Sequence, residues 1–162
     1  MRTTGGTPER LTTDSGPSFA PTPSPDGTEV AYHQMVSGSR EIFVVSVSGG
    51  PRRQLTATRR DASYPQWSPD GRALAFYNQT QADTFPVSVL RRTADGRWAA
   101  KARVVGHGNG PAWNPNGDSV VVTAGPFGVL AQTADSSGFA SARVIYRPNP
   151  GSSDPIPETV PK

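Results

Sequence analysis

The sequence predicts an all-β chain made of three repeated four-stranded units. The turn Ser24-Pro25-Asp26-Gly27 recurs 44 residues later as Ser68-Pro69-Asp70-Gly71, and a relaxed copy, Asn114-Pro115-Asn116-Gly117, follows after another 46 residues. A fixed period of this length is typical of repeat architectures. The 15 Val, against 5 Leu and 3 Ile, also favour strands, because branched side chains suit a pleated, half-buried surface.

The repeated turn has a mechanical explanation. Pro sets φ for the first central position, Asp accepts a backbone N–H at the second, and Gly takes the left-handed conformation that reverses the chain. Trp67 and Trp113 precede the second and third turns, whereas Pro23 stands in the first copy. We expect these Trp side chains to wedge between adjacent sheets. The residues predicted to be structural are Pro25, Asp26, Gly27, Trp67, Pro69, Asp70, Gly71, Trp113, Pro115 and Gly117.

Each unit is expected to form one strand before the turn and three after it. In unit one, residues 13–56, the apolar runs on either side of the turn and the Gly49-Gly50 hairpin predict strands at 19–23, 28–33, 41–47 and 52–56. In unit two, residues 57–106, the same pattern predicts 63–67, 72–78, 85–92 and 97–105. In unit three, residues 107–146, it predicts 110–113, 118–124, 129–133 and 139–146.

The two ends of the sequence differ from the repeat. Residues 5–12 return in altered form at 49–56, so a leading outer strand is expected at 8–12, belonging to an earlier unit. Residues 147–162 are expected to be a tail or linker. This segment contains Pro148, Pro150, Pro155, Pro157 and Pro161, and Pro cannot donate to a strand ladder.

The residues around the second turn carry a family resemblance. The order Trp67-Ser68-Pro69-Asp70-Gly71, an apolar strand, an Ile42-Phe43-Val44-Val45 type strand, Gly-Gly and Gln54-Leu55-Thr56 resembles the WD-like β-propeller repeat of TolB proteins. The resemblance implies a partial β-propeller of residues 1–146, with about three four-stranded blades plus the leading outer strand. The ring is expected to be incomplete, because closed propellers have about four to eight blades.

The resemblance implies a non-catalytic segment that mediates protein–protein interaction, in the manner of the Tol-Pal envelope system. It implies a bacterial periplasmic or otherwise extracytoplasmic location, although residues 1–6 lack the apolar core of a signal peptide. The repeat is also similar to the propellers of prolyl-oligopeptidase-type peptidases and to sensor regions of some bacterial kinases. The chain could therefore belong to a larger enzyme whose catalytic domain lies elsewhere. Within this chain no catalytic, metal or cofactor motif is found, so none is expected.

A protein partner is expected on one loop face. The candidate binding residues there are His33, Arg40, Arg59, Arg60, Asn78 and His107. The alternative for the histidines is a solvated loop position, and for the arginines a charged, protected edge. Self-association through the open ends of the arc is a further expectation. Nucleic acid is not expected despite a pI near 9.7, because the basic residues are dispersed. Membrane insertion is not expected, because no apolar run approaches about 18 residues.

Overall fold

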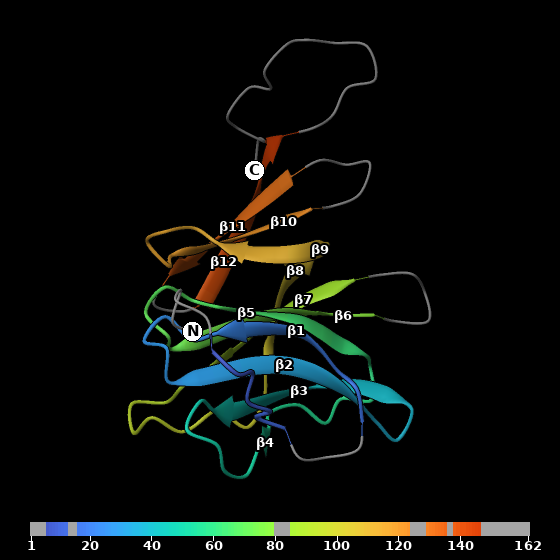
Figure 1. Ribbon diagram of the computed structural model, residues 1–162. Coiled ribbons are helices and arrows are strands. Elements are labelled where there is room, and N and C mark those ends of the chain that lie inside the picture. The colour runs from blue at the N-terminus through green and yellow to red at the C-terminus, as the bar shows by residue number, and fades with distance from the viewer. Residues whose placement is uncertain (1–5, 13–15, 80–84, 124–128, 136–137, 147–162) are drawn as a thin grey trace.

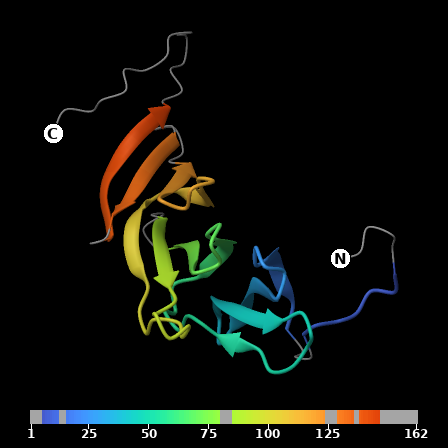
Figure 2. The same ribbon diagram turned by 90° about the vertical axis from the view of Figure 1, so that its left-hand side faces the viewer.

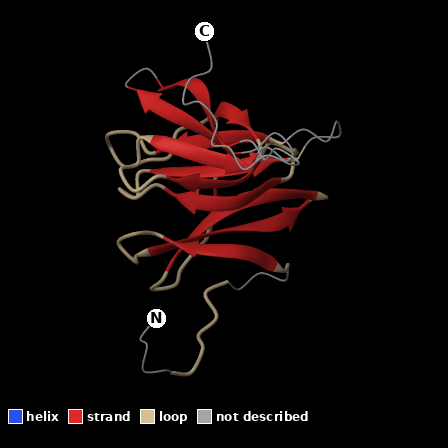
Figure 3. Cartoon of the chain, turned by 90° about the horizontal axis from the view of Figure 1, so that it is seen from above, coloured by secondary structure: helices blue, strands red, loops and turns tan. Residues whose placement is uncertain are grey.

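The computed structural model describes residues 6–12, 16–79, 85–123, 129–135 and 138–146. They form three four-stranded antiparallel sheets, which we call blades 1, 2 and 3 in chain order (Figure 1). In each blade the strands lie side by side in sequence order. Figure 2 shows the three sheets fanned into an open arc, and Figure 3 shows strands and loops without a helix in the described part of the chain. The predicted all-β, incomplete propeller is therefore confirmed.

The strand bounds follow the repeat. Blade 1 contains β1 (Ser18–Pro23), β2 (Glu29–Val36), β3 (Ser39–Ser46) and β4 (Arg53–Gln54). Blade 2 contains β5 (Ala62–Trp67), β6 (Ala73–Asn78), β7 (Pro86–Arg91) and β8 (Arg103–His107). Blade 3 contains β9 (Asn109–Trp113), β10 (Ser119–Thr123), β11 (Val129–Asp135) and β12 (Gly138–Tyr146).

Two outer strands differ from expectation. The strand predicted at 97–105 begins only at Arg103. The residues before it belong to a tight hairpin, in which Trp98 forms an isolated bridge with Arg92 and the Ala99 N–H donates to the Arg91 carbonyl at 2.9 Å. In blade 1 the outer strand β4 has two residues instead of five. The leading outer strand predicted at 8–12 is also not formed. Residues 6–12 lie outside any strand, because a strand needs a neighbouring strand to share its hydrogen bonds. Leu11 packs instead against a cluster formed by Tyr32, Phe43 and Val45 on blade 1. The predicted tail, 147–162, falls outside the described residues.

The core lies between the blades. One cluster joins Ala31, Ile42 and Val44 of blade 1 to Ala62, Trp67, Leu74, Phe76 and Leu90 of blade 2. A second joins Ala73, Ala75, Val87, Val89 and Val105 of blade 2 to Val120 and Val122 of blade 3. Each blade therefore buries its apolar face only by packing on the next one, as the repeat predicts.

The two tryptophans fix each blade to the one before it. The Trp67 indole N–H of blade 2 donates to the Thr22 carbonyl of blade 1 at 3.1 Å. The Trp113 indole N–H of blade 3 donates to the Gln66 carbonyl of blade 2 at 3.0 Å. Thr22 and Gln66 lie 44 residues apart, so both bonds join equivalent positions. The predicted wedge between sheets is present and carries a hydrogen bond.

Each repeated turn is held by hydrogen bonds among its own residues. The Ser68 hydroxyl donates to Asp70 Oδ1 at 2.6 Å and accepts the Ala73 N–H at 2.8 Å. Ser24 and Asp26 make the same contacts in blade 1. In blade 3, Asn114 Oδ1 accepts the Ser119 N–H at 3.1 Å, so Asn replaces Ser with its function retained. These contacts explain why the turn residues repeat without invoking any activity.

Candidate functional site

Five aromatic rings form a continuous row across the junction of blades 1 and 2, which we call the aromatic row: Phe19, His33, Tyr64, Tyr77 and Phe85. Successive ring centroids lie 5.6, 5.4, 5.4 and 5.8 Å apart. These separations are those of interacting aromatic pairs. The rings come from the start of β1, the middle of β2, the first half of β5, the end of β6 and the loop before β7, so the row runs across both blades.

Irregular inner strands bring two of these rings to the surface. Ala20 and Tyr64 adopt left-handed backbone angles, with φ of 48° and 53°. Each precedes a Pro, and the pairing of β1 with β2 and of β5 with β6 shifts register there. Pro cannot donate to the ladder, and a bulge accommodates the missing bond. Phe19 remains 48% exposed and Tyr64 47% exposed, so the bulges accompany two half-exposed rings on a rigid strand framework.

His33 is the buried member of the aromatic row. Its side chain is only 4% exposed and lies between the rings of Phe19 and Tyr64. Its Nδ1 accepts the backbone N–H of Tyr64 at 3.3 Å, which ties blade 1 to blade 2 at the bulge. Burial lowers the pKa of His33, and the nearby Arg40 charge lowers it further, although Asp61 opposes the shift. The imidazole is therefore neutral at pH 7 and positions Tyr64.

Arg40 contributes a cation beside the row. Its Nε lies 3.7 Å from Asp61 Oδ1, and its Nη2 donates to Gln79 Oε1 at 3.4 Å. About a third of its side chain remains exposed, at 32%, so the guanidinium is accessible.

Tyr77 is an uncharged member of the row. Burial, with a smaller contribution from Tyr64, raises the pKa of Tyr77, so its phenol is neutral. The surface combines aromatic rings with one oriented cation.

The connection between β4 and β5 is held rigidly beside this surface. The buried Glu41 carboxylate accepts the Thr56 hydroxyl at 2.5 Å and the backbone N–H groups of Thr58 and Arg59 at 3.3 and 2.9 Å. Asp61 N–H donates to Ser39 Oγ at 3.1 Å. Buried Glu is rare unless its oxygens are hydrogen-bonded, and here both are used. The connection is therefore fixed by the strand on which it lies.

The structure separates the six predicted binding residues. Arg40 joins the aromatic row, and the exposed Arg59 and Arg60 lie on the neighbouring connection. His33 and Asn78, predicted at the ends of strands 28–33 and 72–78 and beside the loop face, lie in β2 and β6 and are 4% and 6% exposed. Their exposure was wrongly predicted, because the central strands of a blade are packed on both faces and cover polar side chains as well as apolar ones. His107 is exposed at the end of β8, where it pairs with Pro86 of β7.

Sequence reasoning missed Phe19, Tyr64, Tyr77 and Phe85 as surface residues. Their aromatic character alone favours the core, and none lies in the repeated turn. A usable signal was Pro21 and Pro65 inside predicted inner strands, because Pro within a strand marks a bulge. The two prolines predict where each inner strand is bulged. They do not predict the aromatic row, because the row forms only when two blades pack together.

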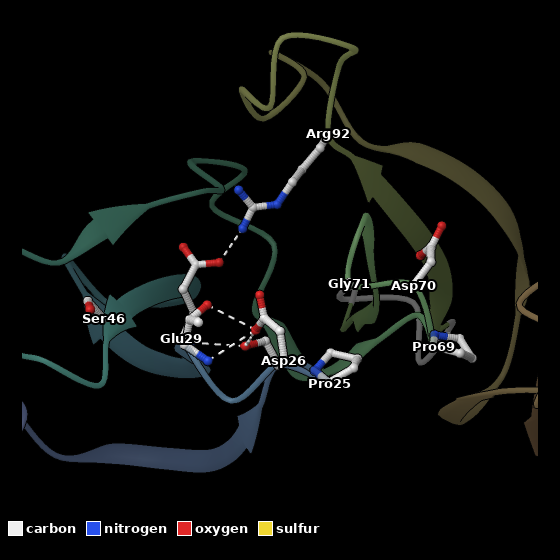
Figure 4. Close-up of a pocket in the computed structure, with 10 residues that line it drawn as sticks. Pro25, Asp26, Glu29, Ser46, Pro69, Asp70, Gly71 and Arg92 are labelled. Atoms are coloured by element: carbon white, nitrogen blue, oxygen red, sulfur yellow. Dashed lines mark hydrogen bonds and ion pairs between the residues drawn. The ribbon is translucent and has the colours of Figure 1, made fainter.

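The opposite face carries a pocket of about 770 Å³ between the turns of blades 1 and 2 (Figure 4). Figure 4 shows Arg92 reaching toward Glu29, with which it forms an ion pair between blades. Hydrogen bonds from Ser24 and Thr28 lower the pKa of Asp26. Burial raises the pKa of Asp70, but hydrogen bonds from Ser68 and Arg72 outweigh that effect and lower it. Asp26 and Asp70 therefore hold the turns, and Glu29 joins the two blades.

No group of three or more His, Asp or Glu side chains among the described residues is arranged to hold a metal ion. The described residues also include no helix with the length and apolar character needed to cross a membrane.

Comparison with known proteins places this surface on a familiar scaffold. The TolB beta propeller domain matches residues 1–128. The chain belongs to the TolB β-propeller family. This TolB-type chain is 36% identical over 127 residues to Tricorn protease homolog 1 of Streptomyces coelicolor, a match that covers 75% of the chain and 10% of that protein.

A second relative is the Tol-Pal system protein TolB 1 of Novosphingobium aromaticivorans. It is 35% identical over 80 residues, which cover 49% of the chain and 17% of that protein. The crystal structure of TolB from Acinetobacter baumannii superposes with a TM-score of 0.64 at 18% identity, covering 88% of the chain and 35% of that structure. At this identity the superposition shows a shared fold. The TolB-type chain spans only 10% to 17% of the length of these two sequence relatives.

Proposed function

We propose that the chain is a non-catalytic part of a TolB-type propeller that binds another protein through the aromatic row and Arg40. The observation that carries this proposal is the pair of half-exposed rings, Phe19 and Tyr64, at bulged inner strands. Aromatic residues and Arg are enriched among the residues that dominate binding at protein interfaces, and aromatic rings bury large areas at small entropic cost.

Backbone strain supports the same assignment. A non-Gly residue at a left-handed φ costs of order 1 kcal/mol or more, and such residues cluster at functional sites. Ala20, Arg59, Asp61 and Tyr64 all have φ between 48° and 54°, and all lie at or beside the row. The strain is offset by blade packing and by the Glu41 contacts, so the surface is preorganised for a partner.

The relatives also support a proposal for the partner and the location. One relative is named as a Tol-Pal system protein, which supports an envelope protein as the partner and an extracytoplasmic location. Fractionation of the native cell tests the location, and recovery of the protein with cytoplasmic markers alone would contradict it.

The binding proposal is tested with variants that keep the backbone. Tyr64→Asn removes the ring and retains a residue that tolerates the left-handed region. Arg40→Gln removes the cation. Arg97→Gln is the matched control, because Arg97 is exposed in the hairpin before β8, outside the row. Envelope proteins captured by the tagged chain and identified by mass spectrometry should be lost with the first two variants and retained with the control.

The result that overturns the proposal is capture that is the same for all three variants, with folding verified by circular dichroism. The signal would then come from another surface. Loss with Arg97→Gln as well would show that capture depends on general charge, which also contradicts a site at the row.

A second candidate function is the propeller part of a larger peptidase. The specific observation is the 36% identity to Tricorn protease homolog 1, whose length far exceeds the match. In that case the row would contact a substrate or the catalytic domain. The genomic sequence on both sides of the coding region distinguishes the candidates, because a peptidase would carry a Ser hydrolase or other catalytic domain in the same frame.

A further inference from the structure

A second pocket, which we call the edge pocket, lies between the outer parts of blades 1 and 2. Its volume is about 420 Å³, within the range of sites for small ligands. We propose that the edge pocket binds the C-terminal residue of a peptide, with an apolar side chain on the floor and the free carboxylate between Arg60 and Lys101.

The floor of the edge pocket is built from buried side chains of blade 2. Phe76 supplies an apolar surface, and Asn78 and Ser88 supply polar groups. Asn78 Nδ2 donates to Ser88 Oγ at 2.9 Å and to the Pro86 carbonyl at 3.4 Å. The carbonyl can only accept, which fixes the orientation of the amide. Among the described residues no donor reaches the buried Asn78 Oδ1. Such an orphan acceptor is uncommon in folded proteins.

Two short segments form the walls. The connection after β4 provides Thr56, Ala57, Thr58 and Arg60 on one side, and residues 100–104 provide Ala100, Lys101, Ala102 and Val104 on the other. Each wall thus carries one cation, and the described residues that line the pocket include no Asp or Glu. Val104, which also lines the pocket, is 56% exposed and adds apolar surface. The charge and the apolar area together match an anionic group attached to a small apolar body.

The wall that carries Arg60 is preorganised. Glu41 lies behind it and uses its carboxylate on Thr56, Thr58 and Arg59, so its charge is engaged by the wall itself. Arg60 N–H is held by the Thr58 hydroxyl at 3.3 Å. The fold therefore holds this wall in place before a ligand binds, so binding loses little conformational entropy of the wall.

The polar floor distinguishes a peptide end from a simple fatty acid. A peptide end offers amide N–H donors next to its carboxylate, and such a donor could satisfy Asn78 Oδ1 after small shifts of the floor side chains. An alkyl chain on the same floor would leave the amide and hydroxyl without new partners, at a cost in binding. The geometry therefore favours an apolar residue with a free carboxylate over an alkyl acid.

The test is a titration of the full ¹⁵N-labelled chain followed by NMR. The probes are acetyl-Ala-Leu with a free carboxylate, the same dipeptide as its C-terminal amide, and sodium octanoate. We expect the free acid to shift the backbone signals of Ser88 and Ala102 and the side-chain signal of Asn78, and to bind about 10-fold more tightly than the amide. Arg60→Gln and Lys101→Gln should each weaken binding about 3-fold to 10-fold.

Arg53→Gln is the matched control, because Arg53 is exposed on β4 and does not line the pocket. It should leave the affinity unchanged, as should Tyr64→Asn in the aromatic row, which separates this inference from the proposed function. Equal binding of acid and amide, tighter binding of octanoate, equal loss with Arg53→Gln, or absence of shifts around Ser88 would each overturn it. Asn78→Ala is avoided, because loss of its two hydrogen bonds could prevent folding.

Discussion

Replacing Trp67 by Ala tests whether blade-to-blade contacts hold the fold. Trp67 is 8% exposed and packs in the cluster between blades 1 and 2. Removing a large buried aromatic side chain costs about 3–5 kcal/mol, from lost apolar transfer and from the cavity that remains. The variant also leaves the Thr22 carbonyl without its indole donor, a bond worth about 1 kcal/mol. We expect the free energy of unfolding to fall by at least about 3 kcal/mol.

Two further variants separate the contributions to the free energy of unfolding. Trp67→Phe keeps most of the apolar volume and removes the N–H, so it should cost about 1–2 kcal/mol. Trp113→Ala should cost less than Trp67→Ala, because Trp113 is half-buried and lies at the margin of its cluster. This ordering separates the effect of burial from the effect of the repeated hydrogen bond.

The assay is urea unfolding of the full chain, followed by far-ultraviolet circular dichroism so that the signal does not depend on Trp fluorescence. If Trp67→Ala does not fold, the loss in Trp67→Phe still measures the contact. A cost below about 1 kcal/mol for Trp67→Ala, or a larger cost for Trp113→Ala than for Trp67→Ala, would refute the reasoning that the burial of each Trp between blades sets its contribution to stability.

Three further predictions follow from single residues. Ala20→Gly should raise the free energy of unfolding by about 0.5–1 kcal/mol in the same urea assay, because Gly accepts the φ of 48°, and a decrease would contradict this. The lowered pKa of His33 means that the unfolded chain binds a proton more readily, so stability should fall from pH 7 to pH 5. His33→Gln should flatten that dependence, and an unchanged dependence in this variant would contradict the role of His33. Glu41→Gln should cost about 1–3 kcal/mol and speed amide hydrogen exchange at Arg59, whereas unchanged exchange would rule out the carboxylate contact.

The repeat could be predicted from sequence because its signals are local. Pro69, Asp70 and Gly71 determine a turn through their own backbone preferences, and Trp67 beside them marks the inner strand. These features recur with the period of the blades, so a second copy corroborates the first. The apolar strands after each turn follow from the same periodicity.

The candidate site could not be predicted in the same way, because it depends on residues from different blades. His33 is buried by Tyr64, which lies 31 residues further along the chain, and the sequence around His33 alone gives no sign of that cover. Asn78 ends a strand whose two faces are both packed, so its polar side chain resembles that of a loop residue. The aromatic row is thus a product of tertiary packing.

The indole–carbonyl contacts give the array a direction. Every junction uses a donor from the later blade and an acceptor from the earlier one, and Thr22 and Gln66 offer that acceptor at the same place in the period. Excision of one whole period would therefore bring Trp113 opposite Thr22 and restore an equivalent contact. Such interchangeable joints let a gene gain or lose blades by duplication or deletion without evolving a new interface at each event.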